Sequence, residues 1–372
     1  MGQRRLTVVQ LLPALETGGV EKGTVEVAKA LRSEGHRAIV ISAGGRMVKE
    51  LEAIGAEHIQ WAIGKKSLWT LRYVYTLRRW LSANRVDILH ARSRLPAWIA
   101  YLAWKGMDPR TRPSFITTVH GMYSVKKYSS IMARGEVVIA VSETIKKYIL
   151  ENYPGVEESR IRVIPRGVDP VQFPYGYKPE RAWLENWYTQ YPQLRGQSVL
   201  TLPGRLTRLK GHEDFVSLMA TLRDRGRDVY GLIVGGEDPR RKAYADEIRQ
   251  RVRDGGLQDR ILFTGYRSDM REIYAVSSIV LSLSTKPESF GRTVLEALCL
   301  GVPVVGYEHG GVGEILREIY PSGLVPVRDA SALADRVLDI LEGDTPVPEQ
   351  EIFTLSSMLE KTLSVYKSLQ HS

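Results

Sequence analysis

Residues 279–300 read IVLSLSTKPESFGRTVLEALCL, which is an apolar run, a polar loop with one glycine, and a second apolar run. The first run predicts a buried strand, and residues 293–300 predict a helix. The backbone N–H groups of Phe290, Gly291 and Arg292 then lie at the start of that helix, where they lack intrahelical acceptors. Such a strand–loop–helix unit is typical of phosphate sites in α/β proteins.

Two carboxylates flank this helix start, because Glu288 lies in the loop and Glu296 lies in the second turn. A carboxylate accepts two hydroxyl groups at once, so both residues suit sugar hydroxyls. The alternative is a surface acid and an acid that stabilises the helix entry through its dipole. Glu296 lies inside the apolar run 294–300, which disfavours that alternative. The stretch therefore combines what a nucleotide sugar requires.

Strand-like runs alternate with helical patterns along the rest of the chain, which indicates parallel sheets with right-handed crossovers. The predicted strands span residues 6–12, 38–42, 88–90, 115–119, 137–141, 161–164, 198–202, 230–234, 261–264, 279–283, 302–305 and 323–325. The predicted helices span residues 23–33, 69–83, 144–151, 213–225, 244–253, 293–300, 331–342 and 352–369.

These strands are too many for one open sheet, and the pattern restarts at residue 198. We therefore predict an α/β fold with two facing Rossmann-like domains, each with a parallel sheet, and a cleft between them. The first domain spans residues 1–173, a connector spans 174–197, and the second domain spans 198–350. Residues 351–372 contain an amphipathic helix that we expect to pack back on the first domain.

The charge of the chain is unevenly distributed. The net charge is +10, and residues 1–175 hold 27 Lys and Arg against 15 Asp and Glu, whereas residues 176–372 hold 25 against 27. The first half should therefore attract polyanions. The single cysteine, Cys299, excludes an intrachain disulfide, which suits a reducing cytoplasm, and no apolar segment is long enough to span a membrane.

Several candidate residues follow strands of the first half. Gly18, Gly19 and Glu21 form a glycine turn before a helix, where backbone N–H groups can approach an anion. A plain tight turn is an equally good interpretation. His90 and Arg92 end another strand, and this histidine is as readily a structural residue as a ligand.

His120 also follows a strand, and the next residue is Gly121. A histidine in this place can bind sugar hydroxyls or move a proton, although neighbouring backbone could satisfy it instead. In the second half, Arg205 and Lys210 lie in a loop between Gly204 and Gly211. They can hold phosphate oxygens, and the alternative is a solvated basic loop.

In their order and spacing these motifs resemble those of the retaining glycosyltransferases of the GT-B fold, glycosyltransferase family 4. The matching pieces, which cover nearly the whole chain, are residues 18–21, 118–121, 141–143, 167–169, 204–205, 210–211 and 288–296. The resemblance implies that Arg205 and Lys210 hold the donor diphosphate, Glu296 the ribose, and Glu288 the transferred sugar. It also implies that His120 lies near the reacting centre.

The remaining roles follow from the same resemblance. Phe290, Gly291 and Arg292 would bind the donor phosphate, as would Gly19, and Gly265 and Tyr266 would flank the base. The acceptor side would include Gly18, Glu21, His90, Arg92 and Ser142. No cofactor or metal is expected, since the family needs none and the sequence has no Asp-x-Asp motif. On frequency alone we expect UDP as the nucleotide.

Residues 65–80 combine Lys and Arg with Trp and Tyr at helical spacing, and Trp98, Trp104, Lys126 and Lys127 add to this character. Such a pattern suits an anionic membrane surface or an anionic glycolipid. The alternative is that the apolar residues between 71 and 81 simply face the core. We expect a peripheral protein at the inner face of a bacterial cytoplasmic membrane, with no nucleic-acid partner.

These features predict transfer of a hexose from a nucleotide sugar to a lipopolysaccharide core or another lipid-linked or cell-surface glycan. A sugar-nucleotide epimerase or a soluble-acceptor synthase of the same fold stays open. A non-catalytic scaffold in polysaccharide assembly is a third alternative. The intact set of Arg205, Lys210, Glu288 and Glu296 counts against the scaffold.

Overall fold

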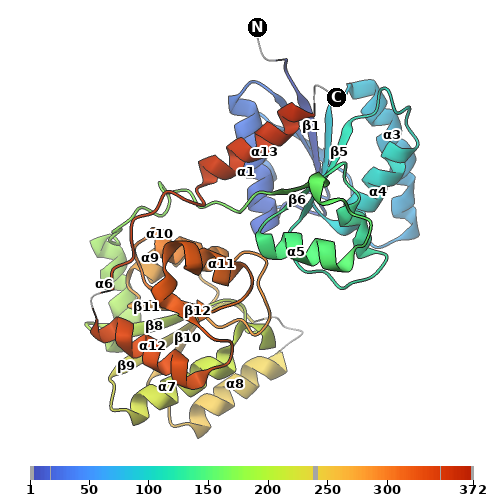
Figure 1. The fold of residues 1–372 in the computed structure, drawn as a ribbon. Helices are drawn as coiled ribbons and strands as arrows, with labels where there is room; N and C mark the ends of the chain where they lie inside the picture. Colours follow the sequence, from blue (N-terminus) through green and yellow to red (C-terminus); the bar gives the residue numbers. More distant parts are fainter. Residues whose placement is uncertain (1–3, 17, 238–241, 344, 370–372) are drawn as a thin grey trace. The chain divides into compact units, whose positions relative to one another are not determined.

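The computed structural model describes residues 4–16, 18–237, 242–343 and 345–369. The chain divides into two compact units (Figure 1). The first unit comprises Met1–Pro165 together with Ser356–Ser372, and the second comprises Arg166–Leu355.

The first unit contains a parallel seven-stranded sheet in the order β3-β2-β1-β4-β5-β6-β7. Its strands are β1 (Thr7–Leu11), β2 (Arg37–Ser42), β3 (Glu57–Gln60), β4 (Ile88–Ala91), β5 (Ser114–Val119), β6 (Val137–Ala140) and β7 (Ile161–Val163). Its helices are α1 (Gly19–Ser33), α2 (Val48–Ala53), α3 (Arg72–Asn84), α4 (Arg94–Lys105), α5 (Glu143–Asn152) and α13 (Leu355–Ser368), with 3-10 turns η1 (Leu68–Leu71), η2 (Ser129–Ala133) and η3 (Glu158–Arg160).

The second unit contains a parallel six-stranded sheet in the order β10-β9-β8-β11-β12-β13. Its strands are β8 (Ser198–Pro203), β9 (Val229–Val234), β10 (Ile261–Gly265), β11 (Ile279–Ser282), β12 (Val304–Tyr307) and β13 (Leu324–Val325). Its helices are α6 (Arg181–Gln190), α7 (His212–Asp224), α8 (Lys242–Asp254), α9 (Met270–Ala275), α10 (Arg292–Cys299), α11 (Gly310–Ile319) and α12 (Ala330–Glu342), with 3-10 turns η4 (Pro192–Leu194), η5 (Arg208–Lys210) and η7 (Pro321–Gly323).

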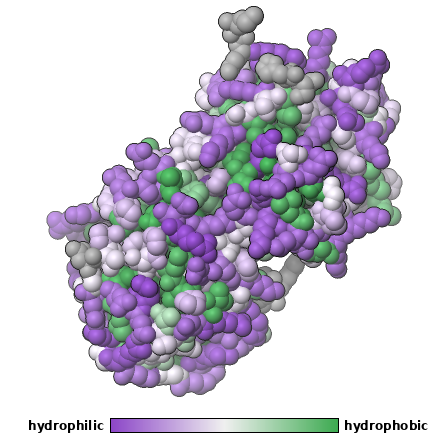
Figure 2. Space-filling view, viewed as in Figure 1, coloured by the Kyte–Doolittle hydropathy of each residue, from purple (hydrophilic) through white to green (hydrophobic). Residues whose placement is uncertain are grey.

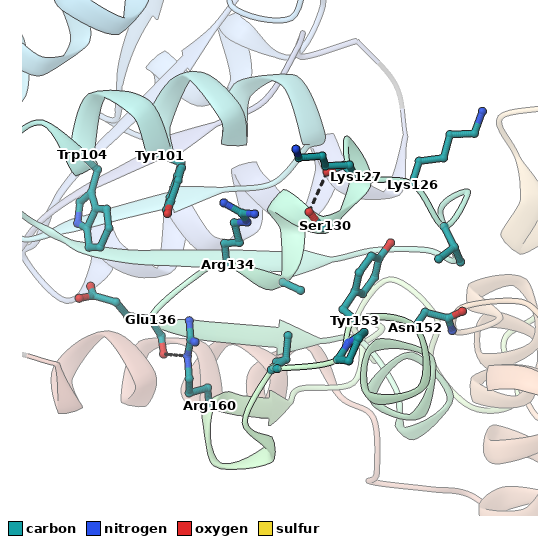
Figure 3. A pocket seen from close by; sticks show the side chains of 15 residues that line it. Tyr101, Trp104, Lys126, Lys127, Ser130, Arg134, Glu136, Asn152, Tyr153 and Arg160 are labelled. Carbon is teal, nitrogen blue, oxygen red and sulfur yellow. Dashed lines mark hydrogen bonds between the residues drawn. The ribbon is translucent and has the colours of Figure 1, made fainter.

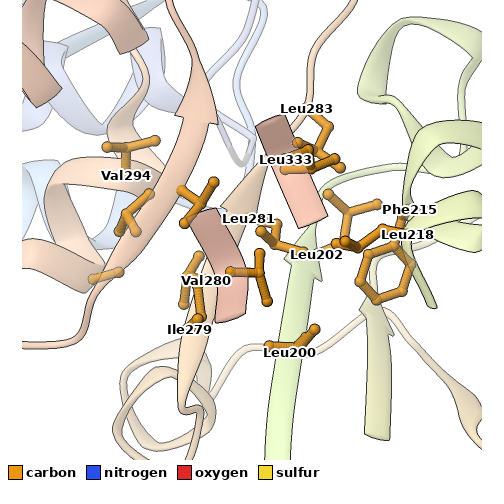
Figure 4. Close-up of a cluster of buried hydrophobic side chains, with 14 of the residues drawn as sticks. Leu200, Leu202, Phe215, Leu218, Ile279, Val280, Leu281, Leu283, Val294 and Leu333 are labelled. Carbon is orange, nitrogen blue, oxygen red and sulfur yellow. The ribbon is translucent and has the colours of Figure 1, made fainter. Parts of the chain in front are cut away.

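The central strands of both sheets, such as β1 and β11, are continuous apolar runs, as expected for parallel strands that helices cover on both faces. In the second unit, Leu200 and Leu202 of β8 and Leu281 of β11 are fully buried, and Phe215 of α7 packs in the same cluster (Figure 4). Hydrophilic residues cover most of the face shown in Figure 2. No helix within the described residues is both long and apolar enough to cross a bilayer.

The two parallel Rossmann-like sheets confirm the predicted α/β fold class. Two helices and one strand of the first unit were not predicted, and the short helix α2 is one of them. Strand β3 reads EHIQ and is only partly buried, so it lacks an apolar run. Helix α4 is apolar around most of its circumference and carries Pro96 in its first turn, so no helical period marks it.

The chain divides before residue 173 because the segment after Pro165 pairs with the segment before α13. Val168 N donates to Phe353 O at 3.0 Å, and Leu355 N donates to Val168 O at 2.9 Å. Residues 174–197 also belong to the second unit, since Trp187 of α6 is 2% exposed and packs against β8 and β9. They are thus part of this core and not a separate connector.

The C-terminal helix α13 packs against the first sheet on the side of α1, whereas α3 and α4 cover the other side (Figure 1). Tyr366 of α13 is fully buried, and its hydroxyl lies 2.6 Å from His90 Nδ1 on β4. The other ring nitrogen of His90 lies 2.6 Å from Thr118 Oγ1 on β5. His90 therefore links the helix to the sheet.

Replacing Tyr366 with Phe removes this buried hydrogen bond without removing the ring. We expect the free energy of unfolding to fall by about 1–3 kcal/mol, the usual cost of a lost buried hydrogen bond. Urea unfolding of the full chain measures the effect. Tyr75→Phe serves as the control because Tyr75 is 63% exposed and should change nothing. Equal stability of the two variants would contradict the role given to His90 and Tyr366.

Candidate functional site

The strand order of the second unit creates a topological switch point at β8. This strand pairs with β9 on one side and with β11 on the other. Open α/β sheets bind their ligands at the carboxyl ends of strands at such a point. The loops that follow β8 and β11 carry Arg205, Lys210 and Glu288, so these three candidates lie at one edge of one sheet.

The loop after β8 places its two cations in different environments. Lys210 Nζ donates to Glu288 Oε1 at 2.6 Å, and the two side chains are 30% and 22% exposed. Arg205 is exposed, and it forms no hydrogen bond or ion pair with any residue that the structure describes. Gly211, at φ 74°, ends this loop, and a Cβ there would overlap the carbonyl oxygen of Leu283. The two loops are therefore in backbone contact.

Glu288 is held by several groups besides Lys210. Ser284 Oγ donates to the same carboxylate oxygen, and Gly311 N donates to the main-chain oxygen of Glu288 at 2.8 Å. Burial raises the pKa of Glu288, but the charge and hydrogen bond of Lys210, with help from Ser284, bring that pKa below its ordinary value. The carboxylate is therefore ionised at neutral pH.

The loop leads directly into α10, as the sequence predicts. Gly291 adopts φ 102° at the N-cap, and a Cβ there would lie 2.9 Å from Val312 Cγ2, so this position favours glycine. Phe290 is 6% exposed and anchors the loop in the core. Arg292 Nε donates to Glu296 Oε1 at 2.9 Å, and the Glu296 side chain is 13% exposed. Arg292 and Glu296 thus form an ion pair within the helix.

The loops after β9 and β10 border the β8 loop. Leu206 N donates to Gly236 O at 3.3 Å, and a Cβ at Gly236 would lie 3.5 Å from Tyr266 Cβ. Gly265 has φ 71°, and Tyr266 is 74% exposed. An exposed ring beside a cationic loop could stack on a nucleotide base.

In the first unit, the two predicted helix starts are present. Gly18 is the N-cap of α1, where a side chain would collide with Glu21, and the space around Gly19 is open. Ser142 is the N-cap of α5, and its Oγ accepts from Ile145 N at 3.1 Å. Ser142 is therefore a capping residue, and Gly19 presents bare backbone at a helix N-terminus.

Two of the acceptor-side candidates need correction. His90 is fully buried between Thr118 and Tyr366. Arg92 is 3% exposed, and burial lowers the pKa of its guanidinium, while Tyr366 and Glu26 oppose that effect. Neither side chain presents a surface to an acceptor, because α13 covers them. We assign His90 and Arg92 to the packing of that helix.

His120 directly follows β5 and is half-buried. Its backbone N–H donates to the Tyr123 hydroxyl at 3.3 Å. The position at a strand's carboxyl end matches the prediction, and its role in a reaction stays a prediction.

Two residues that position Glu288 were not predicted as site residues. Ser284 reaches the carboxylate from four residues earlier in the chain. His309 Nε2 lies 2.7 Å from Ser284 O and so ties the β11 loop to the start of α11. Three glycines directly follow His309 or lie close behind it, at 310, 311 and 313, and this glycine-rich helix start is the sequence signal that could have found it. Ser284 carried no signal of its own.

Clusters of three or more His, Cys, Asp or Glu side chains that could hold a metal ion do not occur in the described part of the chain.

Two glycosyltransferase family models match this chain, one in each half. A model described as Glycosyltransferase Family 4 matches residues 17–172, and one described as Glycosyl transferases group 1 matches residues 187–353. The crystal structure of a glycosyltransferase from Rickettsia africae ESF-5 has a TM-score of 0.85 and 33% identity, with coverage of 98% of this chain and 99% of that chain.

Two further comparisons are more distant. The N-acetyl-alpha-D-glucosaminyl L-malate synthase of Bacillus anthracis is 26% identical over 346 residues, which are 88% of this chain and 85% of that protein. Anabaena Alr3699/HepE in complex with UDP and glucose has a TM-score of 0.75 at 21% identity, with coverage of 98% and 95%. The last likeness shows the fold alone.

The pair of Lys210 and Glu288 predicts a dependence of stability on pH. Because the folded-state pKa of Glu288 is lowered, its ionised form stabilises the fold above the ordinary glutamate pKa of about 4.3 and loses that effect as pH falls through the lowered value. We expect the difference in unfolding temperature between wild type and Glu288→Gln to be largest near pH 7 and to shrink below about pH 4.

The matched control is Glu349→Gln, because Glu349 is exposed and has no ion-pair partner among the described residues. Its difference from wild type should stay small at every pH. A Glu288→Gln difference that is independent of pH would show that the ionised pair does not stabilise the fold.

Proposed function

The chain belongs to the family 4 glycosyltransferases of the GT-B fold, and on that premise we propose a retaining hexosyltransferase that uses a UDP-sugar. The proposed acceptor is a lipopolysaccharide core or another lipid-linked or cell-surface glycan. One observation carries the proposal: the loops after β8 and β11 bring Lys210 and Glu288 into contact beside the start of α10.

The chemistry asks for charge neutralisation and positioning. The donor diphosphate gains negative charge as the bond to the sugar breaks, and Arg205, Lys210 and the N–H groups at the start of α10 supply positive potential for it. Ionised Glu288 accepts hydrogen bonds from sugar hydroxyls, and Glu296 accepts them from the ribose diol. In a retaining transfer on one face of the sugar, the leaving phosphate oxygen takes the proton of the acceptor hydroxyl.

Support for UDP comes from the fold neighbour that was solved with UDP and glucose. In this chain the exposed ring of Tyr266 lies beside the β8 loop and suits the uracil base. His120 is the proposed residue next to the transferred sugar on the side of the first unit.

Support for a lipid-linked acceptor comes from the outer surface of the first unit. Leu68 and Trp69 are 85% and 79% exposed, and they follow Lys65 and Lys66 in the chain. Leu77 and Leu81 of α3 are buried, so the core-facing alternative holds for them but not for η1. Exposed apolar side chains among unpaired cations suit the interface of an anionic membrane.

Trp104 does not contribute to this surface. It is 8% exposed, and its Nε1 donates to Pro113 O at 2.7 Å. We propose that the protein lies at the inner face of the bacterial cytoplasmic membrane through the segment 65–79. We name these residues the basic aromatic segment.

A soluble acceptor is the second candidate, and one observation favours it. One of the relatives that span 88% of this chain is named N-acetyl-alpha-D-glucosaminyl L-malate synthase, and L-malate is not a lipid. The same donor site would then serve a small acceptor, and the basic aromatic segment would have another partner.

A thermal-shift panel with UDP, GDP, ADP and CMP tests the donor site. We expect UDP to raise the unfolding temperature of the wild type, because a ligand that binds only the folded state stabilises it by mass action. Lys210→Ala and Glu296→Ala should lose most of that shift. Arg208→Ala is the matched control, since Arg208 pairs with Glu247 at 2.5 Å on the side of α8. A shift that survives in both site variants would refute this donor site.

Sedimentation with lipid vesicles tests the membrane proposal. Binding should occur with phosphatidylglycerol vesicles at low salt, and it should weaken at high salt or with phosphatidylcholine alone. Leu68→Ser with Trp69→Ser should reduce binding about tenfold or more, because a buried Leu or Trp contributes roughly 2 kcal/mol.

Val171→Ser is the control for this pair of substitutions, because Val171 is 82% exposed but lies in the second unit. Equal binding to neutral and anionic vesicles, or none to either, would remove the membrane proposal and favour the soluble acceptor.

A further inference from the structure

A cavity of about 640 Å³ in the first unit has no part in the site described above (Figure 3). Tyr101 and Trp104 of α4 form one wall, residues 125–134 form a second, and residues 152–156 after α5 form a third. Its size lies within the range of about 300–1,000 Å³ that small-ligand sites occupy.

The cavity lies near the amino ends of the strands. Glu136 and Arg160, which line it, directly precede β6 and β7. The candidates His120 and Ser142 follow the carboxyl ends of β5 and β6. Strands of this length separate the two edges by roughly 13–20 Å, so Glu136 and Arg160 lie well away from His120 and Ser142, whereas Lys126 and Lys127 lie on the connection that follows His120.

Cations dominate the lining, because the one acid is already neutralised. Glu136 Oε1 lies 3.7 Å from Arg112 Nη2, and its other carboxylate oxygen accepts from Phe115 N at 2.8 Å. Arg160 donates to the main-chain oxygens of Gly135 and Glu136. These groups are therefore occupied within the chain.

The other three cations have no such partner. Lys126, Lys127 and Arg134 are exposed, and none of them forms an ion pair within the described residues. Arg134 is oriented by aromatic rings, with its guanidinium 5.6 Å from the ring centres of both Trp98 and Tyr101. Three uncompensated charges at one cavity attract an anionic group.

Three aromatic side chains, Tyr101, Trp104 and Tyr153, also line the cavity. Tyr101 stacks on Trp104 with ring centres 5.9 Å apart. Tyr153 is 8% exposed, its hydroxyl lies 3.1 Å from that of Tyr148, and burial raises its pKa, so the hydroxyl stays neutral. Flat aromatic walls with a few polar tips suit the C–H faces and hydroxyls of a sugar ring.

We propose that this cavity binds an acidic saccharide, a sugar that carries a carboxylate or a phosphate. The three unpaired cations would hold the acidic group, and the walls formed by Tyr101 and Tyr153 would contact the sugar. A simple anion would leave the aromatic walls unused, and a neutral sugar would leave the charges uncompensated. This binding function goes beyond the donor and acceptor sites and does not depend on them.

Calorimetric titration of the full chain tests the proposal with a tetrasaccharide of alternating glucuronic acid and N-acetylglucosamine. We expect it to bind. Neutral maltotetraose and inorganic phosphate should bind at least about tenfold more weakly, because maltotetraose has no acidic group and phosphate has no sugar ring. Lys126→Gln with Lys127→Gln should weaken binding of the acidic tetrasaccharide by about tenfold or more, because two charge-assisted contacts are lost.

The matched control is Lys65→Gln with Lys66→Gln, which removes the same charge from the basic aromatic segment of the same unit. It should leave binding of the acidic tetrasaccharide unchanged, and both double variants should keep the thermal shift with UDP. The proposal is overturned if the acidic tetrasaccharide does not bind, if maltotetraose or phosphate binds equally well, or if both double variants lose affinity equally.

Phosphatidylglycerol vesicles test whether the anionic ligand of these cations is a lipid headgroup instead of an acidic saccharide. Vesicle binding that depends on Lys126 and Lys127 and is not displaced by the acidic tetrasaccharide would assign these cations to a lipid surface. That outcome would also overturn the proposal. Displacement of Lys126- and Lys127-dependent binding by the tetrasaccharide would support it.

Discussion

The contact between Lys210 and Glu288 joins two loops that lie 78 residues apart in the sequence. The backbones of these loops approach closely, and a side chain at Gly211 would collide with the main chain of Leu283. The strand order brings the loops together, and Gly211 permits the contact. The start of α10, the orientation of Glu288 and the place of Ser284 all depend on this arrangement.

Local patterns were sufficient to predict most of the fold. Strands such as β1 and β11 are continuous apolar runs, since parallel strands are buried on both faces. Strand β3 was missed because an edge strand buries fewer side chains and its sequence carries no apolar run. Helix α4 was missed because apolar residues such as Leu102 also occupy its exposed side, which obscures the helical period.

The sequence identified Lys210 and Glu288 as candidates in loops that follow two strands, and the structure places these two side chains in contact, while their roles stay predictions. The environment of a candidate was not predictable where a segment distant in the sequence covers it. His90 looked like a ligand at a strand end, but Tyr366 covers it from 276 residues further along the chain. Ser284 Oγ donates to Glu288, and His309 Nε2 lies beside the main-chain oxygen of Ser284. These contacts depend on how the loops lie relative to one another, which no sequence pattern encodes.

The two units differ in how they balance their cations, and this difference bears on their partners. On α8 and its surroundings, Arg249 and Arg251 each pair with carboxylates of their own unit. In the first unit, Lys65, Lys66, Lys126 and Lys127 form no ion pair within the described residues. Like charges that remain uncompensated oppose the compact state, so they contribute nothing to the fold. The anionic partners proposed above would compensate these charges, and the two groups of lysines lie on separate segments of the first unit.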